Sequence, residues 1–155
     1  MRKFIGRPVL TIEATDPPEL VQAFSLTENT ILRAARSLVI EYNNPTYTAI
    51  SMKLYGYRSG PTVEIAESTN SWAAADVSTL AHAYKELYFT FDDVPLAAGI
   101  TYCVGLVFTG YTGSQASHLT WASEWPTPVY QEGLTILQTD AANMPLSLSI
   151  LGAKQ

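Results

Sequence analysis

The residues that could perform acid–base or metal chemistry are few and widely spaced. The chain has two histidines, His82 and His118, and neither lies in a metal-ligand spacing such as HExxH. The sequence also contains no GxSxG nucleophile elbow and no glycine-rich phosphate loop. We therefore expect no catalytic residues, no resident metal and no cofactor.

Carboxylate pairs are the remaining candidates for catalysis. A glycosidase holds two carboxyl groups roughly 5–9 Å apart across a cleft. Glu64 and Glu67, or Asp92 and Asp93, are close in sequence. Neighbours on a strand point to opposite faces, so Asp92 and Asp93 are expected to diverge. These pairs favour a non-enzymatic protein.

A calcium site formed by acidic residues in loops is an alternative. Asp76 and Glu124 lie in segments expected to be loops, where carboxylates and backbone carbonyls can bind Ca²⁺. Nothing in their spacing requires them to meet.

Aromatic residues in irregular segments are better candidates for binding. Trp125 and Tyr130 flank the segment Pro126–Pro128, and Trp72 sits in a polar loop. Flat aromatic faces stack on sugar rings and anchor protein interfaces. These three residues are the candidate partner-binding or glycan-binding positions, and the alternative is that they cover the core.

Charge excludes one class of partner. The formal net charge is −5, and charged residues make up 15% of the chain against 47% apolar residues. Nucleic-acid binding needs a basic face, which we do not expect here. The low charged share indicates a protein that covers much of its surface by assembly or partner binding. A small basic cluster, Arg2, Lys3 and Arg7, is either a solvated terminus or an arm that docks on an acidic neighbour.

Three features that the sequence lacks bear on the cellular setting, namely a second cysteine, a membrane span and a signal peptide. The single cysteine, Cys103, cannot form an intrachain disulfide and is expected to be buried in an apolar run. No apolar stretch approaches the ~18 residues of a membrane span. The first residues lack the apolar segment of a signal peptide. We expect a protein made in the cytoplasm that does not bind membranes.

These residues must be positioned by short strands. Residues 1–20 are interrupted by prolines and are expected to form an extended N-terminal arm, followed by one domain over 21–155. Period-2 alternation predicts strands over 24–27, 47–57, 62–66 and 87–92. A near-continuous apolar run predicts a strand over 101–108 that is covered on both faces, and shorter runs predict strands over 119–122, 134–137 and 146–151. Residues 31–42 fit either a helix or a strand in their first half and favour a strand in their second.

Three local predictions can be checked directly. Val63 and Ile65 are expected to face inward, and Asp92-Asp93 is expected to end its strand. Residues 67–82 are expected to form a loop with one helical turn. Eight or nine short strands separated by turns predict an all-β protein, a jelly-roll-like β-sandwich of about eight strands.

Residues 22–122 resemble the jelly-roll domains of the choice-of-anchor family. The likeness lies in the opening 22–29, in the F-x-F strand 88–91 that leads through Val94-Pro95-Leu96 to Gly99, and in the apolar strand 99–106. The resemblance implies a carbohydrate-binding-like sandwich. Residues 149–155 do not resemble the sorting tail of that family, so we do not expect a cell-surface anchor. Similar sandwiches occur in structural and decoration proteins of bacteriophages.

We therefore expect a non-enzymatic virion structural protein on the surface of a phage capsid or tail, as a decoration, spike or fibre-base module. Its partners would be itself, as a homo-oligomer and by preference a homotrimer, and a major capsid or tail protein reached by the N-terminal arm. A host glycan is a further expected partner. The alternative is a carbohydrate-binding module, and a glycan-active enzyme is a second alternative.

Overall fold

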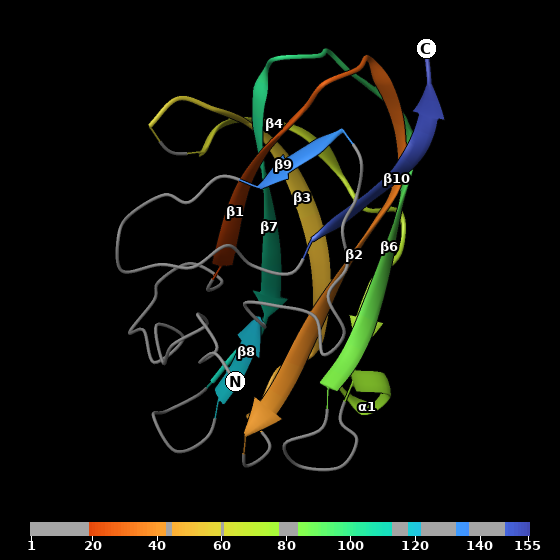
Figure 1. The fold of residues 1–155 in the computed structure, drawn as a ribbon. Coiled ribbons are helices and arrows are strands. Elements are labelled where there is room, and N and C mark those ends of the chain that lie inside the picture. The colour runs from red at the N-terminus through yellow and green to blue at the C-terminus, as the bar shows by residue number, and fades with distance from the viewer. Residues whose placement is uncertain are drawn as a thin grey trace.

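Two antiparallel sheets face one another in the computed structural model of the chain (Figure 1). The structure describes residues 19–42, 45–59, 61–77, 84–112, 118–121, 133–136 and 148–155. Most of the expected arm lies outside these residues, and the first strand begins at Glu19. The prediction of an all-β, jelly-roll-like sandwich is confirmed.

The first sheet has the order β4-β3-β7-β1-β9, with β5 paired to β3. Its strands are β1 (Glu19–Leu26), β3 (Ala49–Tyr57), β4 (Pro61–Glu67), β5 (Trp72–Ala73), β7 (Thr101–Thr109) and β9 (Leu134–Ile136). The second sheet has the order β10-β2-β6, with β8 also paired to β2. Its strands are β2 (Thr30–Tyr42), β6 (Tyr84–Leu96), β8 (His118–Trp121) and β10 (Ser149–Lys154).

Successive strands mostly change sheet, so neighbours in each sheet come from distant parts of the chain. β1 pairs with β7, and β2 lies between β10 and β6. This connectivity is typical of jelly rolls and other Greek-key sandwiches. The expected helical turn is present as α1 (Ala74–Val77), next to β5.

The core lies between the sheets and is built from alternate residues of the strands. The largest fully buried side chains are Phe24, Phe89, Phe108, Leu32, Ile50, Met52, Leu54, Leu87, Leu96 and Leu106. β7 is buried over almost its whole length, as the continuous apolar run predicts. Cys103 is fully buried, as expected.

β2 is a single strand of 13 residues, which resolves the ambiguity of residues 31–42. The ladder with β6 shifts register between Leu32 and Ala34. Such a bulge changes which residues face inward, because it adds residues on one strand only. Leu32, Ala35 and Val39 therefore all reach the core, and their spacing imitates one face of a helix.

Two local predictions are wrong. β6 does not end at Asp92-Asp93 but continues to Leu96, because Asp93 takes a positive φ of 37° within the bulge opposite β2. Val63 and Ile65 do not face the core: their exposed fractions are 68% and 43%. The β3–β4 ladder shifts register twice, between Leu54 and Tyr55 and between Tyr55 and Tyr57, so strict alternation is lost along β4.

The bulge between β10 and β2 sets a steric limit on β10. Its ladder with β2 shifts register between Leu151 and Gly152. A Cβ atom added to Gly152 would lie 2.1 Å from the carbonyl oxygen of Ile31, so the two backbones approach too closely for any side chain.

We expect Gly152→Ala to lower the free energy of unfolding by about 3 kcal/mol, because backbone must move to admit the methyl group. Gly99→Ala is the control, since Gly99 has a φ of 73° but nothing lies within 4 Å of an added Cβ. It should cost only about 1–2 kcal/mol. Urea denaturation of both variants measures the difference, and an equal loss would contradict this account of the bulge.

Candidate functional site

One edge of the second sheet is covered by a side chain instead of a strand. Asn70 lies between β4 and β5 and reaches the edge strand β6. Its Nδ2 donates to the carbonyl oxygen of Tyr88 over 2.9 Å, and its Oδ1 accepts from the backbone N–H of Thr90 over 2.7 Å. The amide thus satisfies a donor and an acceptor of β6, as a neighbouring strand would.

Trp72, a candidate from the sequence, belongs to the same cover. Its Nε1 donates to the carbonyl oxygen of Tyr88 over 2.9 Å, and its half-buried ring packs against the core. The Lys85 ammonium lies 5.6 Å from the ring centroid, within the range of a cation–π interaction. The indole N–H and part of the ring are therefore engaged within the domain.

The structure does not test whether the predicted binding residues meet. Arg2, Lys3, Arg7, Trp125 and Tyr130 lie outside the described residues. Of the two acids considered for a calcium site, Asp76 is exposed on α1 and Glu124 lies outside the described residues.

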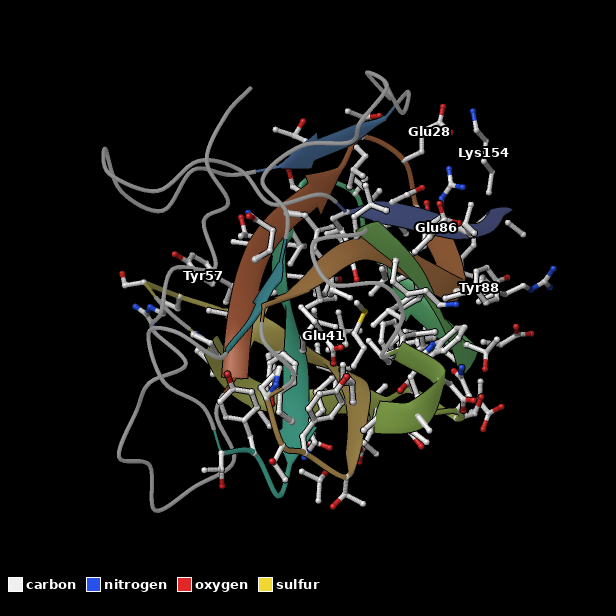
Figure 2. All side chains as sticks on the ribbon, turned by 90° about the horizontal axis from the view of Figure 1, so that it is seen from below. Glu28, Glu41, Tyr57, Glu86, Tyr88 and Lys154 are labelled. Carbon is white, nitrogen blue, oxygen red and sulfur yellow. The ribbon has the colours of Figure 1, made fainter. Side chains whose placement is uncertain are left out.

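A buried acid and a phenol meet near the end of β2. Glu41 and Tyr47 are only 8% and 6% exposed, and the Tyr47 hydroxyl donates to Oε1 of Glu41. Figure 2 shows Glu41 within the fold, whereas Glu86 and Tyr88 lie at its periphery. Burial raises the pKa of Tyr47 far above its ordinary value, and the hydrogen bond to Glu41 and the negative charge of Glu41 raise it further. Tyr47 therefore stays protonated and acts as a hydrogen-bond donor.

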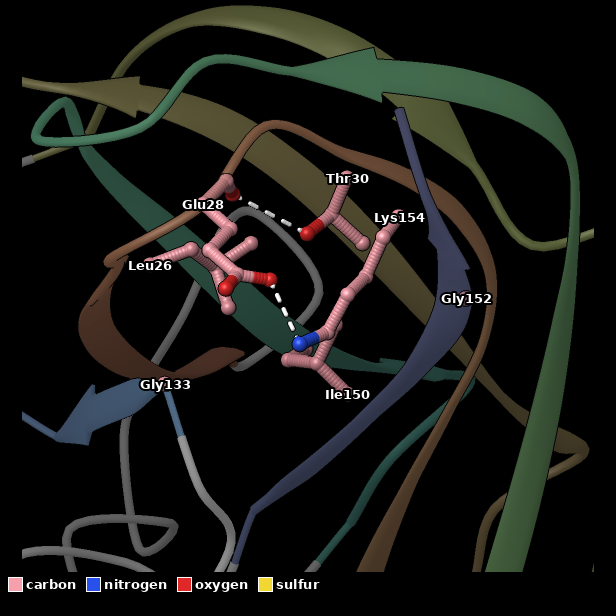
Figure 3. A pocket seen from close by; sticks show the side chains of 7 residues that line it. All are labelled: Leu26, Glu28, Thr30, Gly133, Ile150, Gly152 and Lys154. Atoms are coloured by element: carbon pink, nitrogen blue, oxygen red, sulfur yellow. Dashed lines mark hydrogen bonds and ion pairs between the residues drawn. The ribbon is translucent and has the colours of Figure 1, made fainter.

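A small pocket opens at the end of the sandwich formed by the β1–β2 turn, β9 and β10 (Figure 3). Its volume is about 100 Å³, and its lining combines Leu26 and Ile150 with Glu28, Thr30 and Lys154. The Lys154 ammonium lies 2.7 Å from Oε2 of Glu28. Small-molecule sites usually have volumes of roughly 300–1,000 Å³, so this pocket is too small to hold a sugar ring with its contacts.

The edge of the first sheet at β4 differs from the covered edge of β6. β4 is the last strand in its sheet and pairs only with β3 among the strands of the described residues. Val63 and Ile65 on this edge are two of the few large apolar side chains that the described surface exposes. An edge strand has unpaired backbone groups and is a ready template for another strand.

One of the two acids on this edge is compensated by a base of the same chain. The Lys53 ammonium on β3 lies 2.9 Å from Oε2 of Glu64, the residue between Val63 and Ile65 in the sequence of β4. Glu67 accepts a hydrogen bond from the Ser51 hydroxyl over 3.0 Å, which leaves its negative charge in place. The β4 edge, defined here as residues 61–67, therefore combines two exposed apolar side chains with one ion-paired acid and one hydrogen-bonded acid, and it is the candidate interaction site.

Sequence reasoning missed this site because it assigned Val63 and Ile65 to the core. One signal for it was present, since Glu64 between them and Pro61 at the strand start are residues that natural edge strands use. The described residues contain no group of three or more His, Cys, Asp or Glu that could hold a metal ion. They also include no helix of the length and apolarity that a membrane span needs.

Comparison with known proteins gives no relative. No family description matches the chain, nor does any curated protein or solved structure. The resemblance to choice-of-anchor domains thus remains an expectation from the sequence.

We expect Asn70→Ala to lower the free energy of unfolding by about 2 kcal/mol, since two backbone hydrogen bonds at the β6 edge are lost. Asn70→Asp keeps an acceptor for the N–H of Thr90 but sets a carboxylate oxygen against the carbonyl oxygen of Tyr88, so it should be destabilised while amide exchange at Thr90 stays closer to that of the wild type. Urea denaturation measures the cost, and amide exchange at Thr90 locates it. Unchanged exchange at Thr90 in Asn70→Ala would refute the role of Asn70.

We expect Tyr47 to make the fold sensitive to alkali. Tyr47 in the unfolded chain loses its proton above its ordinary pKa of 10.0, whereas folded Tyr47 keeps it. The unfolded state then binds fewer protons, so stability falls as pH rises above 10, by about 1.4 kcal/mol per pH unit for this group.

The Tyr47→Phe variant should be less stable at neutral pH, by about 1–3 kcal/mol, because a buried carboxylate oxygen loses its donor. It should also lose less stability above pH 10. Urea denaturation at several pH values compares it with Tyr88→Phe, which removes an exposed phenol. Identical slopes for wild type and Tyr47→Phe would contradict the assignment.

Proposed function

We propose that this protein is a non-enzymatic module that acts by assembly and surface binding, and specifically a virion structural protein. The observation that supports assembly most directly is the β4 edge, where Val63 and Ile65 are exposed on a strand that pairs on one side only within the described part of the chain. Apolar side chains on a sheet edge lose contact with water when another chain covers them, which favours association.

Composition supports the same proposal. Only 15% of residues are charged, against a usual share of roughly 25% in soluble domains. Interfaces between subunits are depleted in charge at their centres. A chain whose surface is largely buried against copies of itself, and against a capsid or tail protein, would have this low share of charged residues.

The proposed attachment uses the N-terminal arm with Arg2, Lys3 and Arg7. β1 begins at Glu19, so removal of residues 1–18 spares every strand of the described sandwich. Binding to a host glycan through Trp72, Trp125 or Tyr130 is a second proposed task of the same particle. The surroundings of Trp72 do not favour that task, because its ring packs against the core and has the Lys85 ammonium 5.6 Å from its centroid.

Light scattering on the purified full chain tests self-assembly. We expect a mass above that of a monomer of 16.9 kDa, increasing with protein concentration. A monomer at every concentration would contradict self-assembly and make a glycan array the next measurement. The variant lacking residues 1–18 should keep its β-sheet circular dichroism spectrum and lose attachment to particles, if the arm docks on them. Retained attachment would contradict the role of the arm.

A further inference from the structure

The edges of β6 and β4, which lie on either side of residues 68–72, differ in how they are covered. The β6 edge receives side-chain hydrogen bonds from Asn70 and Trp72, which satisfy backbone groups of Tyr88 and Thr90. No comparable cover reaches β4 from the described residues, and Val63 is 68% exposed there. Among the residues that the structure describes, one edge is closed and the adjacent one has no such cover.

We propose that the β4 edge docks on the β4 edge of a second copy of this chain, around a two-fold axis at Glu64. This inference rests on the proposed function and names the surface and the partner for it. A two-fold contact joins the same patch of both subunits, so the patch must be complementary to itself. The strands then run antiparallel.

The order of residues along β4 meets this requirement. With the axis at Glu64, Val63 of each copy lies against Ile65 of the other, and both apolar side chains are covered. An axis at Val63 would place Ile65 against Pro61, which has no N–H to share. An axis at Ile65 would place Val63 against Glu67, an apolar residue against an acid.

The charges at the axis are also compatible with a second copy. Two Glu64 carboxylates would approach one another, but each already has the Lys53 ammonium of its own chain at 2.9 Å. The centre of the contact is therefore a neutral set of two acids and two bases. A strongly charged partner would gain little from this ion-paired centre, whereas an identical edge gains the burial of Val63 and Ile65.

The contact is small, and this sets its strength. One strand edge of seven residues, with two register shifts against β3, covers far less than the roughly 1,200–2,000 Å² of a stable interface. The association should therefore be weak and concentration-dependent unless other surfaces join it. A two-fold contact also gives even copy numbers, which departs from the trimer expected from the sequence.

Single-cysteine variants of the full chain test the geometry. Cys103 is fully buried, so a cysteine added on the surface is the accessible thiol among the described residues. Glu64→Cys should form a disulfide-linked dimer on mild oxidation, because residues at the axis lie opposite one another. Thr62→Cys is the matched control: two residues from the axis, its copies lie roughly 13 Å apart at ~3.3 Å per residue, too far for a disulfide.

Light scattering of Val63→Lys tests the energetics. We expect its self-association to weaken at least about tenfold, since a charge replaces the apolar contact at the interface. Ile100→Lys is the control, because Ile100 is 50% exposed but precedes β7, which β3 separates from β4, and it should associate like wild type. Circular dichroism confirms that both variants are folded.

The outcomes separate this inference from the proposed function. Dimer formation by Glu64→Cys alone, with weaker association of Val63→Lys, supports the β4 contact. An oligomer that Val63→Lys leaves intact, or equal crosslinking at residues 62 and 64, overturns the β4 contact and leaves assembly standing. A wild-type monomer at every concentration, with no crosslink at residue 64, overturns both.

Discussion

The sandwich depends on the way residues 68–72 join its two sheets. This segment leaves β4 in the first sheet, and Asn70 then completes the hydrogen bonding of β6 in the second. Trp72 follows at once and pairs through β5 with β3 while its indole bonds to β6. An edge strand in a sandwich must be paired, covered or solvated, and here a few polar atoms cover it. The two layers are thereby fixed to each other at one side, in addition to the apolar core between them.

This arrangement connects fold to function. Because the covering segment turns toward β6, it leaves the outer side of β4, where Val63 and Ile65 are exposed. The Glu41–Tyr47 pair and the pocket beside Glu28 are satisfied within the chain, by a hydrogen bond and by an ion pair respectively. The β4 edge is the described surface at which exposed apolar area and free backbone coincide. Association is therefore the activity that the described surface supports best.

The sequence predicted the strands that obey simple alternation and failed where bulges occur. β3 and β7 follow from their apolar patterns, since each is regular over its length. The apolar spacing of β2 resembles one face of a helix because a bulge near Leu32 shifts its inward positions. Val63 was predicted to lie in the core because the two register shifts of the β3–β4 ladder cannot be seen in the apolar pattern of the sequence. Asn70 had no signal, because its role depends on β6, which follows much later in the chain. The expected contributions of Trp125 and Tyr130 lie outside the described residues and stay predictions.

The position of β10 has a consequence for synthesis of the chain. Residues 149–154 pair with residues 30–36 of β2. This part of β2 therefore cannot form its hydrogen bonds on that side until nearly the whole chain has been synthesised. Closing such long loops costs conformational entropy before the stabilising contacts form, so sandwiches of this kind fold slowly, on the order of milliseconds to seconds. Until then, the emerging chain displays an unfinished β2 side to its neighbours on the ribosome. High local concentrations of nascent copies would therefore favour misassembly at that strand.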